Sequence, residues 1–227
     1  MKYLFTLIAV GITTALFSQT SEIITVKAGQ KISDVYKEIY RYPQFTAGRV
    51  YFVNGDVSAA KLNYNLITET MLFVNQKGDT LAIADETAVK FITIEKDSFY
   101  YDNGYLEFVD GNKSVRLAIK QRIKFSDKKK IGAFGMPTST VRTESDDTFL
   151  GDRRFNFLVA EDLIFKKETE FYLSQGSNNF VVLNKKNLLK IFPRNKENIE
   201  AFLREKNINL QAAKDIEILI QYLGSLS

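Results

Sequence analysis

The chain has 227 residues, of which 45% are hydrophobic and 26% are charged, and its formal net charge is +4. It contains neither cysteine nor histidine, which excludes disulfides, thiolate nucleophiles, Ser-His-Asp catalysis and the zinc and haem sites built on these residues. This is the composition of a folded protein of one domain with an appendage, and the net charge is too small to indicate a nucleic-acid partner.

The N-terminus has the pattern of a secretory signal peptide. Lys2 precedes an apolar stretch from Tyr3 to Phe17, and the polar residues Ser18-Gln19-Thr20 follow it. An apolar stretch of about 15 residues suits a signal peptide, whereas a membrane-spanning helix needs about 20. No later stretch approaches that length, so we expect no membrane span in the mature chain. The sequence therefore predicts a signal peptide at 1–18 and export to the periplasm or cell envelope.

The segment from Ser21 to Pro43 predicts a strand and then a short helix. Ser21 to Lys27 has the residue types of a strand. Apolar and aromatic residues then recur at helical spacing, at Ile32, Val35, Tyr36, Ile39 and Tyr40. Ser33 is a candidate N-cap for this helix, and Pro43 ends it.

From Arg49 to Phe125 the hydrophobic period is two, which is typical of strands. The predicted strands are Val50–Val53, Leu62–Tyr64, Met71–Val74, Leu81–Ile83, Val89–Ile94 and Leu106–Val109. Turn sequences separate them at Asn54-Gly55-Asp56, Lys77-Gly78-Asp79, Asp102-Asn103-Gly104 and Asp110-Gly111-Asn112. Asn-Gly and Asp-Gly supply the positive φ of tight hairpins. Connections this short favour an antiparallel meander over βαβ units.

Residues 126–152 interrupt this pattern with charged, Gly, Ser and Thr residues, and they predict a long loop that is either mobile or partner-binding. Strands are then expected at Phe155–Val159, Leu163–Phe165, Phe171–Leu173 and Phe180–Leu183. Helical spacing returns after Asn184, after Asn195 and after Asn207 or Asn209. The last helix carries its apolar residues on one face, at Ile216, Leu219, Ile220 and Leu223. Since helices this short are marginal alone, we expect them to pack on the sheet.

These patterns together predict an α+β fold. Its main part is an antiparallel β meander that forms a roll, barrel or sandwich, with a short N-terminal helix and a C-terminal helical hairpin packed on it. The predicted organisation is a signal peptide at 1–18, a β-rich domain at 19–183 with a long loop at 126–152, and a helical subdomain at 184–227.

The clearest candidate site is the stretch from Val115 to Phe125. Apolar residues occupy its odd-numbered positions, interrupted only by Gln121, and cations occupy most of its even-numbered positions: Arg116, Lys120, Arg122 and Lys124. On a strand these two sets point to opposite faces. We interpret the cations either as an anion-binding row for phosphates or carboxylates of an envelope lipid or glycan, or as a solvated face that protects an edge strand from aggregation.

Acidic residues provide weaker candidates. Glu144, Asp146, Asp147 and Asp152 form an acidic run that lacks the order of an EF-hand loop, so we interpret it as a solvated loop and predict no metal site. Glu168 and Glu170 share one face of an extended strand, as a carboxylate pair of a hydrolase would, but any chain this rich in acids contains such pairs. The sequence predicts no cofactor.

Two stretches carry a resemblance. The first contains Phe45, Gly48-Arg49-Val50, Asn54-Gly55, Leu62-Asn63-Tyr64-Asn65, Met71 and Phe73, and the second runs from Asn184-Lys185-Lys186 to Phe192-Pro193 and through the closing helices. Both resemble a broad group of exported β-rich proteins of Bacteroidota-type bacteria. The resemblance implies a periplasmic or cell-envelope setting, and it implies no activity and no functional residues.

The sequence favours a non-catalytic cell-envelope binding or scaffolding protein. One alternative is a carrier that holds an apolar or anionic envelope ligand within the β-roll. A second alternative is a carboxylate-based hydrolase. Envelope protein, lipid and glycan are the candidate partners, nucleic acid is not expected, and the sequence leaves the oligomeric state open.

We predict that the mature chain begins between Ser18 and Ser21, because the apolar stretch ends there. Intact-mass measurement of the protein recovered from the periplasm of its host checks this prediction. A mass that still includes residues 1–17 would contradict it.

Overall fold

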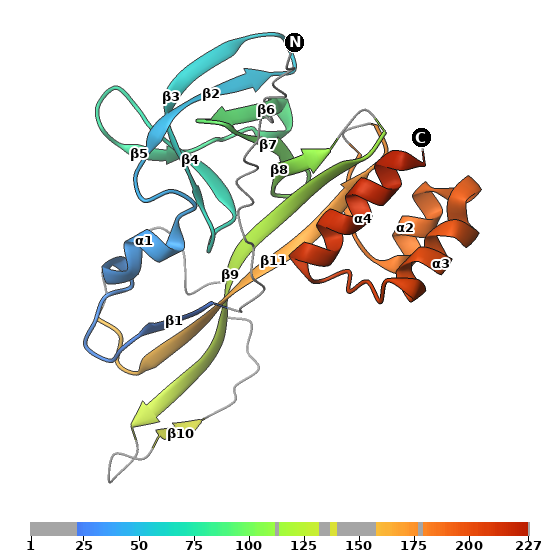
Figure 1. Cartoon of the computed structure of the whole chain (residues 1–227). Helices are drawn as coiled ribbons and strands as arrows, with labels where there is room; N and C mark the ends of the chain where they lie inside the picture. The colour runs from blue at the N-terminus through green and yellow to red at the C-terminus, as the bar shows by residue number, and fades with distance from the viewer. Residues whose placement is uncertain (1–21, 112–113, 132–136, 140–157, 177–178, 227) are drawn as a thin grey trace, which may run out of the picture.

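A computed structural model describes residues 22–111, 114–131, 137–139, 158–176 and 179–226. Within them, strands form a twelve-stranded antiparallel sheet with the order β1-β11-β9-β8-β7-β6-β2-β3-β4-β5, while β10 pairs with β9 and β12 with β11 (Figure 1). The strands are β1 Ile23–Val26, β2 Thr46–Phe52, β3 Val57–Asn65, β4 Thr70–Val74, β5 Thr80–Ala82, β6 Val89–Ile94, β7 Asp97–Tyr101, β8 Tyr105–Gly111, β9 Arg116–Ile131, β10 Pro137–Ser139, β11 Asp162–Ser174 and β12 Val181–Val182. The predicted signal peptide and the acidic run from Glu144 to Asp152 lie outside the described residues.

Helices occupy the two ends of the described chain. The 3-10 helix η1 Ile32–Val35 leads into α1 Tyr36–Ile39, and a further 3-10 turn, η2 Glu86–Ala88, precedes β6. The C-terminal helices are α2 Lys185–Ile191, η5 Pro193–Asn195, α3 Lys196–Glu205 and α4 Ala213–Ser225. No helix of the described part is long and apolar enough to cross a membrane. The predicted α+β fold is confirmed, and the sheet is an open roll because its terminal strands, β1 and β5, do not pair with each other.

Most hairpins lie where the turn sequences predict them. Gly55 joins β2 to β3 with a φ of 96°, and Gly104 joins β7 to β8 with a φ of 112°, a conformation that L side chains rarely adopt. The β6–β7 hairpin was not predicted. Its turn uses Glu95, which has a φ of 53° without being glycine, so the usual Gly signal is missing.

The two longest strands, β9 and β11, pair with each other from Arg116↔Ser174 to Lys129↔Asp162, with one β-bulge at Ile164/Phe165. The predicted loop at 126–152 is therefore wrong at its start, since 126–131 continues β9 and β10 pairs back on it. Pairing with β11 and β10 satisfies the backbone hydrogen-bonding groups of this charged stretch. A prediction based on hydrophobic periodicity cannot detect such pairing. Residues 132–136 and 140–152 of the predicted loop lie outside the described residues.

Of three hydrophobic clusters among the described residues, two larger cores lie on the same face of the β9–β11 ladder, and a small one of Leu106, Ala118 and Phe180 lies on the opposite face. The roll core fills the concave side of the sheet with residues such as Leu62, Ile92 and Phe99, and it includes Ile123 of β9. The helix core joins Leu117 and Leu173 of the ladder to α2, α3 and α4. Figure 1 shows α4 lying along the end of the ladder where β8 pairs with β9, whereas β1 and β10 lie at the other end.

The C-terminal helices follow the sequence closely. The side chain of Asn184 accepts a hydrogen bond of 2.8 Å from the backbone N–H of Asn187 and so caps α2. The predicted apolar stripe of α4 is buried, with exposed fractions of 0% for Ile216, 0% for Leu219, 5% for Ile220 and 0% for Leu223. The predicted packing of these helices on the sheet is confirmed.

We predict that Leu219→Ala lowers the free energy of unfolding by about 2–5 kcal/mol, because it leaves a cavity in the helix core. The neighbouring Ile218 is 47% exposed on the same helix, so Ile218→Ala is the matched control, with an expected change below about 1 kcal/mol. Urea unfolding measures both variants. Equal losses of stability would contradict the burial of this stripe.

Candidate functional site

All four predicted site residues lie on one face of β9, opposite the two cores. We call this side of the sheet the outer face. Within β9, the odd-numbered Leu117, Ile119 and Ile123 are buried in the direction of the cores, and the cations alternate with them. The interpretation of β9 as a protected edge strand is wrong, because β9 lies between β8 and β11.

Arg116 lies in a cluster of aromatic rings. Its guanidinium carbon is 4.9 Å from the ring centroid of Tyr100, 5.1 Å from that of Phe108 and 5.5 Å from that of Phe180. Its Nη2 also donates a hydrogen bond of 2.9 Å to the Tyr100 hydroxyl. Cation–π contacts of this kind hold the charge on the outer face while its stem covers apolar surface.

Lys120 holds a turn in place. Its side chain is buried, and Nζ donates a hydrogen bond of 2.8 Å to the carbonyl oxygen of Asn103 in the β7–β8 turn. A Cβ on Gly104 would lie 2.9 Å from this Nζ, and the φ of 112° at Gly104 itself favours glycine. Of the four cations, Lys120 has the clearest structural role.

Arg122 and Lys124 share one carboxylate. Arg122 Nε and Lys124 Nζ lie 3.3 Å and 3.4 Å from Oε2 of Glu168 on β11. Partial burial of Glu168 opposes its ionisation, but the two cations together hold the pKa of this carboxyl below its usual value. Glu170 accepts a hydrogen bond of 2.8 Å from the Tyr172 hydroxyl. A hydrolase needs one carboxyl with a raised pKa as its general acid, and Glu168 has the opposite shift.

A row of aromatic rings crosses the outer face next to these cations. Its members are Tyr51, Phe91, Tyr100, Phe108 and Phe180, and we call it the aromatic row. Tyr51 and Phe91 stack with ring centroids 4.3 Å apart, and Phe91–Tyr100 and Tyr100–Phe180 follow at 6.1 Å each. Apart from Phe180, these rings are half-buried. Val57, which pairs with Tyr51 in the sheet, is 55% exposed and extends the row onto β3.

Sequence reasoning missed the aromatic row, although a signal was present. The runs Val50-Tyr51-Phe52 and Phe99-Tyr100-Tyr101 place apolar side chains on both faces of their strands, which is unusual where one face of an antiparallel sheet is solvated. Only the register brings Tyr51 of β2 opposite Phe91 of β6.

Basic residues predominate on the outer face. The strand register places seven cations on the outer face. In β11 this holds as far as the β-bulge at Ile164/Phe165. The cations are Arg49, Lys61, Arg116, Lys120, Arg122, Lys124 and Lys166. The carboxylates at the corresponding positions are Glu168 and Glu170, and Asp102 of the β7–β8 turn lies close enough to Tyr172 to raise the pKa of its hydroxyl. Asp127 and Asp162 lie beyond the bulge. The outer face therefore has an excess of positive charge over the area of the aromatic row.

A second polar cluster lies on the inner side of the sheet. Arg41 donates two hydrogen bonds of 2.7 Å to the carboxylate of Glu107, and it lies 3.6 Å from Asp97. Tyr42 donates a hydrogen bond of 2.7 Å to the same Asp97. Bidentate pairing of this kind is strong and geometrically specific, so it fixes the segment between α1 and β2 against the sheet.

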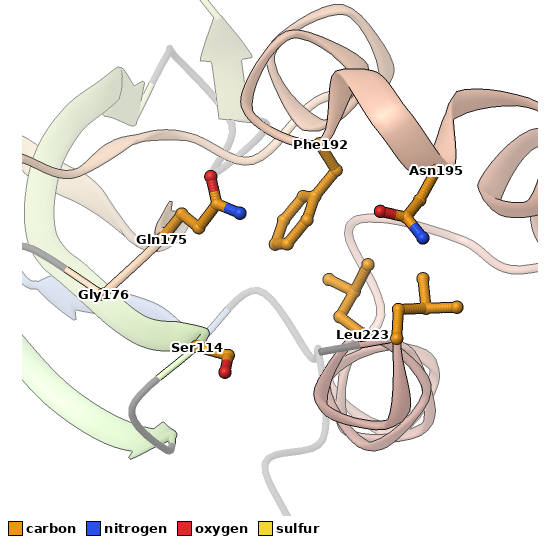
Figure 2. Close-up of a pocket in the computed structure, with 7 residues that line it drawn as sticks. Ser114, Gln175, Gly176, Phe192, Asn195 and Leu223 are labelled. Carbon is orange, nitrogen blue, oxygen red and sulfur yellow. The ribbon is translucent and has the colours of Figure 1, made fainter.

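The pocket in Figure 2 lies between the sheet and the C-terminal helices. It has a volume of about 240 Å³ and is lined by Ser114, Gln175, Gly176, Phe192, Asn195, Leu223 and Leu226. Phe192 and Leu223 approach it from the helices, and Gln175 approaches it from the bend that follows β11 (Figure 2). Ligand pockets usually have about 300–1,000 Å³, so we interpret this space as the seam between the two layers.

No family model matches the chain, and neither the curated proteins nor the solved structures include a match. Within the described ranges, no group of three or more Asp or Glu side chains is placed to hold a metal ion. The candidate functional site is thus the outer face, defined by its aromatic row and its cations.

We predict that the protein loses stability above about pH 10. Burial raises the pKa of the Tyr42, Tyr64 and Tyr172 hydroxyls, and carboxylates next to Tyr42 and Tyr172 raise it further. Unfolded tyrosine titrates near 10, so above this pH the unfolded chain loses protons that the folded protein keeps. The free energy of unfolding therefore falls as the pH rises.

Urea unfolding midpoints at pH 7, 9, 10 and 11 measure this dependence. The Tyr64 hydroxyl makes no hydrogen bond among the described residues, so Tyr64→Phe is a suitable control that removes one titrating group. Its midpoint should decline less steeply between pH 10 and 11. A wild-type midpoint that stays constant up to pH 11 would contradict the burial of these hydroxyls.

Proposed function

We propose that this protein is a non-catalytic binding or scaffolding protein of the bacterial cell envelope and that the outer face is its binding surface. The observation that carries the proposal is the aromatic row. Antiparallel sheets with one solvated face usually place polar residues on it, and contiguous apolar area at a surface is typical of an interaction site.

The residue types of the outer face support binding. Tyrosine, phenylalanine and arginine are enriched in interfaces, where each buries a large area at a moderate entropic cost. Arg116 places positive charge and aromatic surface side by side, since its guanidinium lies against three rings of the aromatic row. A partner would contact rings and positive charge together.

The envelope setting is supported by the N-terminal sequence. A basic residue, an apolar stretch and a polar boundary direct a chain to export, and an exported chain without cysteine fits a bacterial envelope better than an animal extracellular space.

The two alternative functions have less support. A carrier needs space within the roll, where Leu62, Ile92 and Phe99 pack together with exposed fractions of 0%, 0% and 1%. A hydrolase needs a protonated carboxyl, whereas the pKa of Glu168 is lowered. Both alternatives stay predictions of the sequence.

The test compares two stacked pairs of rings. We predict that the double variant Tyr51→Ala/Phe91→Ala, which removes the 4.3 Å stack of the outer face, reduces co-sedimentation with the envelope fraction of the host at least about tenfold, as loss of interface hot spots does. The control is Phe202→Ala/Tyr222→Ala, which removes a 3.8 Å stack between α3 and α4.

The control variant should bind the envelope fraction like the wild type. Circular dichroism and urea unfolding establish that both variants are folded before binding is compared. If the two double variants bind equally well, the outer face is not the binding surface.

A further inference from the structure

We propose that the outer face binds the surface of an anionic phospholipid membrane. This inference rests on the proposed function, since it names the partner of the same surface. The structure supplies three supporting features: the charge of the outer face, the amphipathic side chains between the charges, and the distance over which the charges are spread.

The first feature is the excess of positive charge. Arg49, Lys61, Lys124 and Lys166 are exposed on the outer face, and Glu168 is shared by Arg122 and Lys124 and so neutralises only part of the charge. Basic side chains next to an anionic lipid surface add their attractions, and these extend over about one Debye length. The complementary partner is a surface with many negative charges.

The second feature is the position of the aromatic and aliphatic groups among these cations. Tyr51 and Tyr100 are half-buried rings of the aromatic row and carry polar hydroxyls. Tyrosine is enriched where hydrocarbon meets water, because one end of its side chain is apolar and the other is polar. Val57 and Ile23, with exposed fractions of 55% and 67%, add aliphatic surface on β3 and β1.

The third feature is the spread of the charges. Lys61 on β3 and Lys166 on β11 belong to strands separated by β2, β6, β7, β8 and β9, which is roughly 30 Å measured along the curved outer surface of the roll at about 4.8 Å per strand. The interior strands already have their backbone groups paired, so an added peptide strand finds no partner there. A lipid surface presents negative charge continuously over such a distance without requiring a groove.

The experiment measures co-sedimentation of the purified protein with vesicles of phosphatidylglycerol and phosphatidylcholine (30:70) and with vesicles of phosphatidylcholine alone. We expect binding to the anionic vesicles that is at least about tenfold tighter than to the neutral ones. It should be lost between 0.1 M and 1 M salt, as the Debye length falls from about 10 Å to about 3 Å. Equal binding to both kinds of vesicle would overturn the inference.

Two variants with the same loss of charge distinguish binding through the outer face from attraction by the net charge of the protein. Arg49→Gln/Lys61→Gln/Lys124→Gln/Lys166→Gln removes exposed cations from the outer face, and Lys186→Gln/Lys190→Gln/Lys206→Gln/Lys214→Gln removes the same charge from exposed positions in the helical subdomain. The first variant should bind anionic vesicles at least about tenfold more weakly, and the second should stay within about twofold of the wild type. Equal losses would show attraction by net charge alone and overturn the inference.

The envelope and vesicle measurements can fail independently. If the protein co-sediments with the envelope fraction through its aromatic row but ignores anionic vesicles, the partner is an envelope protein or glycan, and only the lipid inference is overturned. If the aromatic-row variant binds the envelope fraction like the wild type, the proposed function itself is overturned.

Discussion

The antiparallel ladder between β9 and β11 is the interaction on which the rest of this protein depends. It runs from Arg116↔Ser174 to Lys129↔Asp162, and it supports the roll core and the helix core on one face. Because side chains alternate along a strand, burying Leu117, Ile119 and Ile123 directs the even-numbered residues of β9 before the β-bulge to the opposite face. The cations of β9 therefore point to a common face because the hydrophobic residues that alternate with them are buried on the other.

The two faces of this sheet differ in the interactions that their side chains make. The cores are mainly apolar, and Arg41 pairs beside the roll core with Glu107 in a bidentate contact and with Asp97. The outer face instead combines half-buried rings with charges that are only partly neutralised, as at Glu168. A solvated ion pair adds little stability, so the stability of the fold comes mainly from its buried apolar clusters, including the small cluster of Leu106, Ala118 and Phe180 on the outer face.

The sequence predicted what local patterns encode. The helix stripe around Leu219 and the turns at Gly55 and Gly104 were correct, because helical spacing and positive φ are properties of neighbouring residues. The continuation of β9 beyond Phe125 was missed, since pairing with β11 and β10 decides it. The cations of β9 were predicted to share a face, but their contacts with Tyr100, Phe180 and Glu168 depend on residues distant in the chain.

The pairing of β1 has a consequence for the order in which the chain folds. Ile23 to Val26 form the first strand, yet their partners are Lys166 to Leu163 in β11. The backbone N–H of Ala28 likewise donates a hydrogen bond of 2.8 Å to the carboxylate of Asp162, 134 residues away. A chain that emerges N-terminus first cannot complete this edge until most of it has been made. Contacts of such long range slow folding, so the β1 edge of the sheet forms only after β11 is available to pair with it.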